Sequence, residues 1–208
     1  MKILICDDHK LVRDGLRRIL QQPDDDTLIM EAGDGTEAID LLKSNSFDIV
    51  LLDISLPGRS GLDVLQAIKT KWPETNVLIL SMHPQEQYAI RAIKLGASGY
   101  LTKNTASEEL LEAVKKVSEG GKFISQSLAE RLALILNKDT RLQKHEVLST
   151  REFEIMIKLA NGIPLQEIGN ELFISVKTVS TYRSRIMAKM GLKANADLTR
   201  YCMENILI

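Results

Sequence analysis

Three carboxylates in this sequence follow apolar runs with the length and composition of buried strands. Asp7 and Asp8 come directly after residues 3–6, and Asp53 ends the apolar run 49–52. An uninterrupted apolar run is typical of a strand covered on both faces, and open α/β sheets bind ligands at the carboxyl ends of their strands. If the two strands are neighbours, the carboxylates lie at one edge of a sheet. Such a cluster needs a cation, and its oxygen ligands favour Mg²⁺.

A hydroxyl and an ammonium group follow two further predicted strands. Ser81 ends the run 77–81, and Lys103 follows the short run 98–101. With Asp53 as a nucleophile toward a phosphoryl group, Mg²⁺ would neutralise the developing charge, and Lys103 and Ser81 would bind the phosphoryl oxygens. Each residue alone is more often structural: the acids as caps, Ser81 as a strand-end hydroxyl and Lys103 as an ion-pair partner of the acids. Their recurrence at four strand ends favours phosphoryl chemistry.

The segments that must position these side chains alternate between strand and helix patterns. Asp34 is expected to cap the second helix, with Glu37 as its capping-box partner. The alternation predicts a doubly wound α/β fold, a five-stranded parallel sheet in the flavodoxin-like order 2-1-3-4-5. In that order the first and third strands are adjacent. Strands are expected at residues 2–6, 27–32, 47–53, 77–81 and 98–101, and the other helices at 9–20, 61–71, 85–95 and 106–119.

The chain changes character after this region. Apolar residues at helical spacing predict a helix at about 127–136, followed by a polar stretch at 137–141. We therefore expect an α/β domain at residues 1–122, a helical or flexible linker at 123–146, and a small all-α domain at 147–208. Residues 1–124 carry 15 basic and 19 acidic groups, whereas residues 125–208 carry 12 basic and 9 acidic groups. A basic second half indicates an anionic partner.

Start and stop signals in residues 147–208 predict a helix-turn-helix. Ser149 and Glu152 form a capping box before the first helix, and Pro164 is expected in the first turn of the second. Ser175 is expected to cap a long third helix that ends at Met190. A last helix is expected at about 194–204. Two helices joined by a short turn, the second with a basic face, are typical of DNA-binding domains.

The third helix of this domain carries the predicted DNA contacts. Residues 176–193 contain five basic groups and no acid. A basic face is often only solvated, but basic groups can contact phosphates, and short polar residues can reach base edges in the major groove. The inward face is expected to consist of Val176, Val179, Ile186, Met187 and Met190. The residues expected to contact DNA are Lys177, Thr178, Ser180, Thr181, Tyr182, Ser184, Arg185 and Lys189.

Composition restricts the class of protein. The chain has 208 residues, 44% of them hydrophobic and 26% charged, as expected for a globular protein. Its two cysteines, Cys6 and Cys202, do not form a disulfide framework and fit a reducing compartment. The N-terminus has no signal-peptide pattern, and no apolar stretch has the length of a membrane span. We therefore expect a cytoplasmic protein without a membrane partner.

Residues 2–120 resemble the receiver domain of bacterial two-component response regulators. The matching residues are Asp7-Asp8, Asp53 followed by Ile54-Ser55-Leu56-Pro57-Gly58, Ser81 and Lys103. The resemblance implies that Asp53 accepts phosphate from a histidine kinase, and that Asp8, Asp53 and the Ser55 carbonyl bind Mg²⁺, with Asp7 assisting through water. It also implies that Ser81 and Tyr100 are the switch residues. The family often has proline where Asn104 follows Lys103, so the cis peptide bond expected there is in doubt.

Residues 148–201 resemble a LuxR-type helix-turn-helix, and the whole chain resembles the NarL/FixJ class of response regulators. The matching segments are 148–152, 167–169, 175–179 and 189–192. The family usually has alanine where Gly169 stands and histidine where Tyr182 stands. Because tyrosine keeps a hydroxyl that can contact phosphate, we expect a changed contact at Tyr182 and no loss of function.

The resemblance implies a transcription regulator that binds promoter DNA under the control of phosphorylation, as a homodimer on activation. No catalytic activity is expected apart from self-phosphorylation and slow self-dephosphorylation. One alternative is a phosphatase or phosphotransferase, but Ser55 stands where a dehalogenase-like site has its second acid. The other alternative is a constitutive DNA-binding protein whose receiver only mediates interactions. The complete set of acids, hydroxyl and lysine argues against that alternative.

Overall fold

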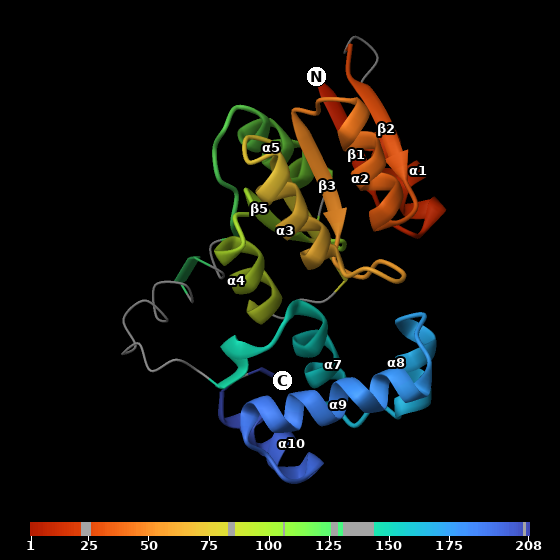
Figure 1. Ribbon diagram of the computed structural model, residues 1–208. Coiled ribbons are helices and arrows are strands. Elements are labelled where there is room, and N and C mark those ends of the chain that lie inside the picture. Colours follow the sequence, from red (N-terminus) through yellow and green to blue (C-terminus); the bar gives the residue numbers. More distant parts are fainter. Residues whose placement is uncertain (22–25, 83–85, 106, 126–128, 131–143, 206) are drawn as a thin grey trace. The chain divides into compact units, whose positions relative to one another are not determined.

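The computed structural model describes residues 1–21, 26–82, 86–105, 107–125, 129–130, 144–205 and 207–208. Its backbone contacts divide the chain into two compact units, Met1–Asn137 and Lys138–Ile208 (Figure 1). Of the helix predicted at about 127–136, only residues 129–130 are among the described residues, and both are helical. Within the described ranges, no helix combines the length and apolar character that crossing a bilayer requires.

The first unit contains a parallel sheet in the order β2-β1-β3-β4-β5, which confirms the predicted fold class and strand order. Every residue of β3 is buried, as expected of a central strand covered on both faces. Helices α1 and α5 pack on one face, and α2, α3 and α4 cover the other (Figure 1). The strands are β1 (Lys2–Cys6), β2 (Leu28–Ala32), β3 (Ile49–Asp53), β4 (Asn76–Ser81) and β5 (Gly99–Thr102). The helices are α1 (Lys10–Leu20), α2 (Gly35–Ser44), α3 (Gly61–Lys71), α4 (Glu86–Lys94) and α5 (Ser107–Ser118).

The strand register brings the polar strand ends to one edge of the sheet. Cys6 of β1 pairs with Leu52 of β3, and Asp53 pairs with Leu80 of β4. Each residue that follows these pairs therefore lies at the carboxyl edge. The polar residues collected there are Asp7, Asp8, Asp53, Ser81 and Lys103.

Local signals fix the start of α2 much as predicted. The Asp34 side chain accepts hydrogen bonds from the backbone N–H groups of Thr36 at 2.7 Å and Glu37 at 2.9 Å. The expected capping box is wrong in one detail, because the Glu37 carboxylate accepts from the N–H of Gly33 at 2.7 Å and not from that of Asp34. Glu37 thus reaches one residue further back and satisfies a donor outside the helix.

The second unit is all-helical and contains the predicted helix-turn-helix. Ser149 and Glu152 form the predicted capping box, and Gly191 closes α9 in the left-handed conformation at a φ of 66°. The prediction for Pro164 is wrong by one position, because its ψ of 145° is extended and makes it the N-cap of α8. The elements are the 3₁₀ helix η1 (Lys144–Val147) and the helices α7 (Thr150–Ala160), α8 (Leu165–Glu171), α9 (Val176–Met190) and α10 (Asn195–Glu204).

The inward face of α9 is largely as predicted. Val179, Ile186 and Met190 are buried, but Val176 is 36% exposed, so its assignment to the core is wrong. Val176 is the first residue of the helix and extends beyond the core that the following turns cover. The turn before α9 packs closely against α8, since a Cβ added to Gly169 of α8 would lie 2.8 Å from the Ile174 carbonyl oxygen. Glycine therefore suits position 169 better than the usual alanine.

Candidate functional site

The carboxyl edge of the sheet holds a buried cluster of ion pairs. The Lys103 Nζ atom lies 2.7 Å from Asp53 Oδ2 and 2.6 Å from Asp7 Oδ2. All three side chains are almost completely buried, with at most 6% of any one exposed. Asp7 and Asp53 come from neighbouring strands and Lys103 from the end of β5. The structure thus brings together three of the residues singled out from the sequence.

The third acid, Asp8, lies beside a residue that the sequence analysis did not single out. The His9 Nδ1 atom lies 2.7 Å from Asp8 Oδ1 and 3.4 Å from Asp7 Oδ1. The His9 backbone N–H also donates to Asp7 Oδ1 at 2.9 Å. One possible ligand atom from each of Asp7, Asp8, His9 and Asp53 lies within 4.8 Å of the others. The only sequence signal for His9 is its place directly after the two acids.

This donor set fits a hard divalent cation. The cluster contains three carboxylates and one ammonium group, which pairs with two of them, so negative charge is in excess. Carboxylate and carbonyl oxygens are the ligands that Mg²⁺ prefers, and it commonly retains water for its other positions. Asp8 keeps part of its side chain accessible, with 24% exposed, so the cluster is open on that side. The residues are therefore compatible with Mg²⁺.

The electrostatics of the cluster follow from burial and from these neighbours. Burial raises the pKa of Asp53, the Asp7 charge raises it further, and Lys103 opposes both without reversing the direction. For Lys103, burial alone would lower the pKa, but Asp53 and Asp7 outweigh it and the pKa is raised. The lysine is therefore held as an ammonium ion between two acids. Such a cation is suited to bind a further anionic oxygen.

Ser81 and Tyr100 form a second layer next to the ion pairs. Ser81 is fully buried at the end of β4, and its carbonyl accepts from the Lys103 backbone N–H at 2.8 Å. Tyr100 is buried in β5, and its hydroxyl is hydrogen-bonded to the Ser81 side chain. Burial raises the pKa of Tyr100 to about 12, so the hydroxyl stays protonated. In this structure the predicted switch aromatic therefore lies inward.

The loop after Asp53 is held tightly against the strand. The backbone N–H of Ser55 donates to Asp53 Oδ1 at 3.2 Å, and the Gly61 N–H donates to the Ile54 carbonyl at 2.9 Å. A Cβ added to Gly61 would lie only 1.9 Å from the Asp53 carbonyl oxygen. Gly61 is thus a further residue of the site that the sequence analysis did not identify.

The described part of the chain has no cis peptide bond, so the bond after Lys103 is trans.

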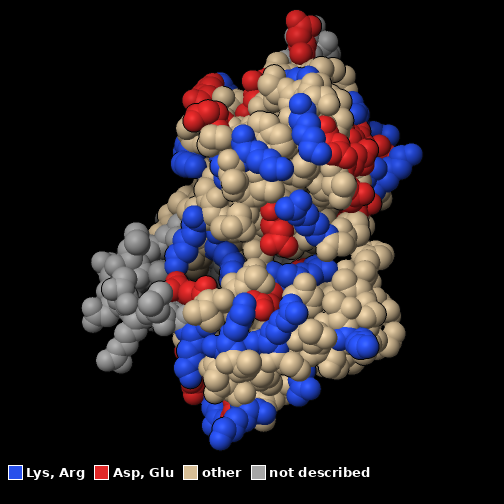
Figure 2. Space-filling model, viewed as in Figure 1, with Lys and Arg blue, Asp and Glu red and all other residues tan. Residues whose placement is uncertain are grey.

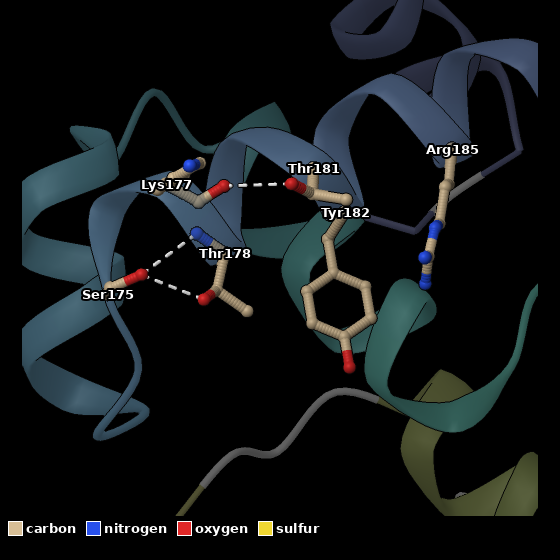
Figure 3. A pocket seen from close by; sticks show the side chains of 6 residues that line it. All are labelled: Ser175, Lys177, Thr178, Thr181, Tyr182 and Arg185. Atoms are coloured by element: carbon tan, nitrogen blue, oxygen red, sulfur yellow. Dashed lines mark hydrogen bonds between the residues drawn. The ribbon is translucent and has the colours of Figure 1, made fainter.

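The second candidate surface lies on α9. Lys177, Ser180, Thr181, Ser184 and Arg185 are exposed, as the sequence predicted. Figure 2 shows blue Lys and Arg side chains on the face of the second unit that α9 crosses. Six residues around the first turns of α9 line one shallow hollow (Figure 3). They are Ser175, Lys177, Thr178, Thr181, Tyr182 and Arg185.

The hollow joins the N-terminus of α9 to longer side chains one to three turns further on. The Ser175 hydroxyl caps the helix by accepting from the Thr178 N–H at 3.1 Å and lies 2.8 Å from the Thr178 hydroxyl. In Figure 3 the Tyr182 ring and the Arg185 guanidinium extend from α9 toward the same side. Helix N-termini, hydroxyls and guanidinium groups are frequent phosphate contacts. Ser175 was predicted only as a cap, and its place in the hollow was missed.

Lys189 is placed differently from the other predicted DNA contacts. Its Nζ atom lies 2.6 Å from Glu152 Oε2, and the Glu152 side chain is only 4% exposed. Glu152 also accepts from the Ser149 backbone N–H at 2.7 Å, so Lys189 ties the end of α9 to the capping box of α7. This ion pair gives Lys189 a structural role that the sequence did not reveal.

Comparisons with known proteins find a family match for each half of the chain. Residues 3–115 match the family described as response regulator receiver domain, and residues 146–202 match bacterial regulatory proteins of the luxR family. The oxygen regulatory protein NreC of Staphylococcus aureus is 37% identical over 215 residues, covering 100% of this chain and 99% of its own.

Solved structures of the response regulator RcsB resemble the chain as well. RcsB from Salmonella enterica serovar Typhimurium, bound to the promoter rprA in the presence of the phosphomimetic BeF₃⁻, is 25% identical with a TM-score of 0.65 over 97% of both chains. A structure of two RcsB dimers bound to two parallel DNAs is 26% identical, with a TM-score of 0.62 over about the same share of both chains.

Proposed function

The chain belongs to the two-component response regulators of the NarL/FixJ class, and we propose that phosphorylation of Asp53 controls its binding to promoter DNA. A receiver domain joined to a LuxR-type helix-turn-helix makes it a phosphorylation-dependent, DNA-binding transcription regulator. The observation that carries the assignment to Asp53 is its place at the end of β3, buried and 2.7 Å from the Lys103 ammonium.

In the proposed reaction the Asp53 carboxylate attacks the phosphorus of a phosphohistidine on the cognate sensor kinase. The new O–P bond gives an acyl phosphate, and the P–N bond breaks as the imidazole leaves. Lys103 lies beside Asp53 Oδ2 and would bind an oxygen of the transferred group. Small acyl phosphates should serve as donors too, because the receiver itself supplies these contacts. Slow self-dephosphorylation by water would reset the switch.

Mg²⁺ is the proposed cofactor. Asp8, Asp53 and the Ser55 carbonyl would hold it directly, and Asp7 through a water molecule. When bound, the ion would neutralise charge on the phosphoryl oxygens. Asp7 is held by Lys103 and by the His9 N–H, so its carboxylate is already oriented toward the cluster.

The proposed response begins at Ser81 and Tyr100. The phosphoryl group adds charge and acceptor oxygens that draw in the Ser81 hydroxyl and Lys103. Tyr100 is bonded to Ser81, so it must adjust when that hydroxyl moves. The face formed by α4, β5 and α5 would then change, which would promote dimerisation or release the DNA-binding domain.

For the second half of the chain we propose binding to double-stranded promoter DNA through α9. We assign residues 1–122 to the receiver, 123–146 to the linker and 147–208 to the DNA-binding domain. A symmetric dimer would place two α9 helices in successive major grooves at two half-sites. Promoter DNA lies in the bacterial cytoplasm, so the switch would work there. The proposed DNA contacts are Lys177, Thr178, Ser180, Thr181, Tyr182, Ser184, Arg185 and Lys189.

Intact mass after incubation with Mg²⁺ and acetyl phosphate tests the proposal. Wild type should gain one phosphoryl group, roughly 80 Da, and Asp53→Asn should gain none. Asp40→Asn is the matched control, because Asp40 is a surface acid with 61% of its side chain exposed. Binding to a duplex selected from a random pool by the phosphorylated protein is then measured with and without acetyl phosphate. A wild type that gains no mass, or an Asp53→Asn variant that gains as much as wild type, would refute the role of Asp53.

A further inference from the structure

The chain that leaves α5 returns to the sheet and pairs with the outer edge of β5. The Phe123 N–H donates to the Ser98 carbonyl at 2.9 Å, and the Tyr100 N–H donates to the Phe123 carbonyl at 3.2 Å. Gly99 and Phe123 form a parallel bridge. Residues 122–124, here called the added strand, therefore extend the sheet beyond β5.

Two further contacts anchor the added strand, and a glycine in β5 allows its close approach. The Phe123 side chain is 8% exposed and belongs to the core between the sheet and α1 and α5. The Lys122 Nζ atom donates to the Ala97 carbonyl at 3.2 Å. A Cβ added to Gly99 would lie 2.5 Å from the Phe123 carbonyl oxygen, so glycine at this position permits the close approach. The pairing is thus built into the sequence of both segments.

A continuous series of contacts joins the added strand to Asp53. The Asp53 carboxylate binds the Lys103 ammonium, and the Lys103 N–H donates to the Ser81 carbonyl. The Ser81 side chain is hydrogen-bonded to Tyr100, whose backbone N–H donates to the Phe123 carbonyl. Tyr100 is thus hydrogen-bonded to Ser81 through its side chain and to the start of the proposed linker through its backbone.

We propose that the added strand couples the phosphorylation site to the linker, and that phosphorylation of Asp53 loosens its pairing with β5. This proposal rests on the proposed function of Asp53. When a phosphoryl group draws the Ser81 hydroxyl away from Tyr100, the hydrogen bond between the two side chains is lost and β5 must adjust. The hydrogen bond from the Tyr100 N–H to the Phe123 carbonyl belongs to the residue that adjusts, so this is the bond that loosens. Residues 122–124, where the receiver meets the proposed linker, are then released from the sheet.

Hydrogen exchange on the full chain tests this coupling directly. The protein is phosphorylated with Mg²⁺ and acetyl phosphate, its mass is checked, and peptides covering residues 98–102 and 121–125 are followed by mass spectrometry. The amides of Tyr100 and Phe123 should exchange at least about threefold faster in the phosphorylated protein, and Asp53→Asn should show no change. Unchanged or slower exchange in a protein that has gained the phosphoryl mass would overturn the coupling. Absence of the mass gain would instead overturn the proposed function of Asp53, so the two failures are distinguishable.

A pair of core variants separates coupling from stability. Phe123→Ala removes the anchor of the added strand, and Leu16→Ala removes a side chain of equal exposure, 8%, from the same core. The measured quantity is the ratio of affinities, phosphorylated to unphosphorylated, for the selected duplex. Phe123→Ala should lower this ratio at least about threefold, while Leu16→Ala leaves it unchanged. Equal ratios in the two variants would overturn the proposal.

Discussion

The acid cluster and the α9 surface are built in opposite ways. In the cluster, Asp7, Asp53 and Lys103 are almost completely buried and bound to one another. On α9, the exposed hydroxyls of Thr181 and Ser184 donate to carbonyls one turn back, at 3.0 and 3.1 Å. The first site holds its groups in fixed positions before any ligand arrives, whereas the second presents them to solvent.

This difference determines whether a substitution changes the stability of the protein or its binding. Removing one member of a buried ion-pair cluster leaves uncompensated charge, so both folding and chemistry suffer. Removing an exposed side chain changes little in the free protein and acts through binding alone. Paired substitutions in the two regions should therefore separate stability from affinity.

The largest effect is expected from Lys103→Met. Two buried carboxylates would lose their shared cation, which should lower the free energy of unfolding by about 3–5 kcal/mol at pH 7 without Mg²⁺. Added Mg²⁺ should recover part of the loss, because it binds the folded acids. Urea unfolding measures both. The control is Arg200→Met, since Arg200 is 65% exposed in its pair with Asp197 and should cost less than about 1 kcal/mol. A Lys103→Met chain as stable as this control would contradict the view of the cluster as a buried charge network.

Gly61→Ala should have the next largest effect on stability. The added methyl group would meet the backbone of Asp53 at 1.9 Å, which no rotamer change can relieve. A loss of about 2–3 kcal/mol is expected, and the rate of phosphorylation by acetyl phosphate should fall with it. Gly15→Ala is the matched control, because Gly15 lies inside α1 with open space around it. Alanine there should stabilise the chain by about 0.5–1 kcal/mol. Equal losses in both variants would contradict the steric account.

Arg185→Ala should instead change binding and leave folding intact. The guanidinium lines the α9 hollow beside Tyr182, and its loss should weaken binding to the selected duplex roughly tenfold. The slope of log affinity against log salt should fall by about 1 if the contact is a phosphate. The free energy of unfolding should stay within about 0.5 kcal/mol of wild type. Arg200→Ala, an exposed arginine on α10, should leave affinity and slope unchanged; a similar loss in that variant would indicate only a general effect of charge.

Much of this arrangement could be predicted from sequence because the signals are local. The uninterrupted apolar run of β3 and the caps at Asp34, Ser149 and Ser175 each act within a few residues. The convergence of Asp7 and Asp53 needed only one further rule, that the ends of adjacent parallel strands share an edge.

The features that could not be predicted are contacts that form only when the chain folds back on itself. Gly99 and Phe123 face each other because the chain returns after α5, and no periodicity in residues 121–125 marks a strand. From the sequence, His9 is only the first residue of a predicted helix. Its contact with Asp8 is visible only in the structure. No local sequence pattern indicates that the Asp53 carbonyl leaves no room for a side chain at Gly61.

Lys189 tests the boundary between the two kinds of site. It lies on the basic helix, yet it binds the buried carboxylate of Glu152, and this contact has a pH signature. Burial alone would raise the pKa of Glu152, but the hydrogen bonds from Lys189 and Ser149 outweigh it and the pKa is lowered. A lowered pKa in the folded state means stability that is fully present above the unfolded value, about 4.3, and lost as the pH falls through the folded value.

Lys189→Met should therefore lower the free energy of unfolding by only about 0.5–1 kcal/mol at pH 7, because Lys189 is 44% exposed and solvent screens the pair. The difference from wild type should shrink toward zero between about pH 5 and pH 3, as Glu152 is protonated in both chains. Urea unfolding across this range measures it. A constant difference would mean that the lysine acts by packing.

If Lys189 also contacts a phosphate, its variant should lower the salt slope of DNA binding by about 1, as Arg185→Ala does. An unchanged slope would place Lys189 with the buried network and leave DNA contact to the residues around the hollow.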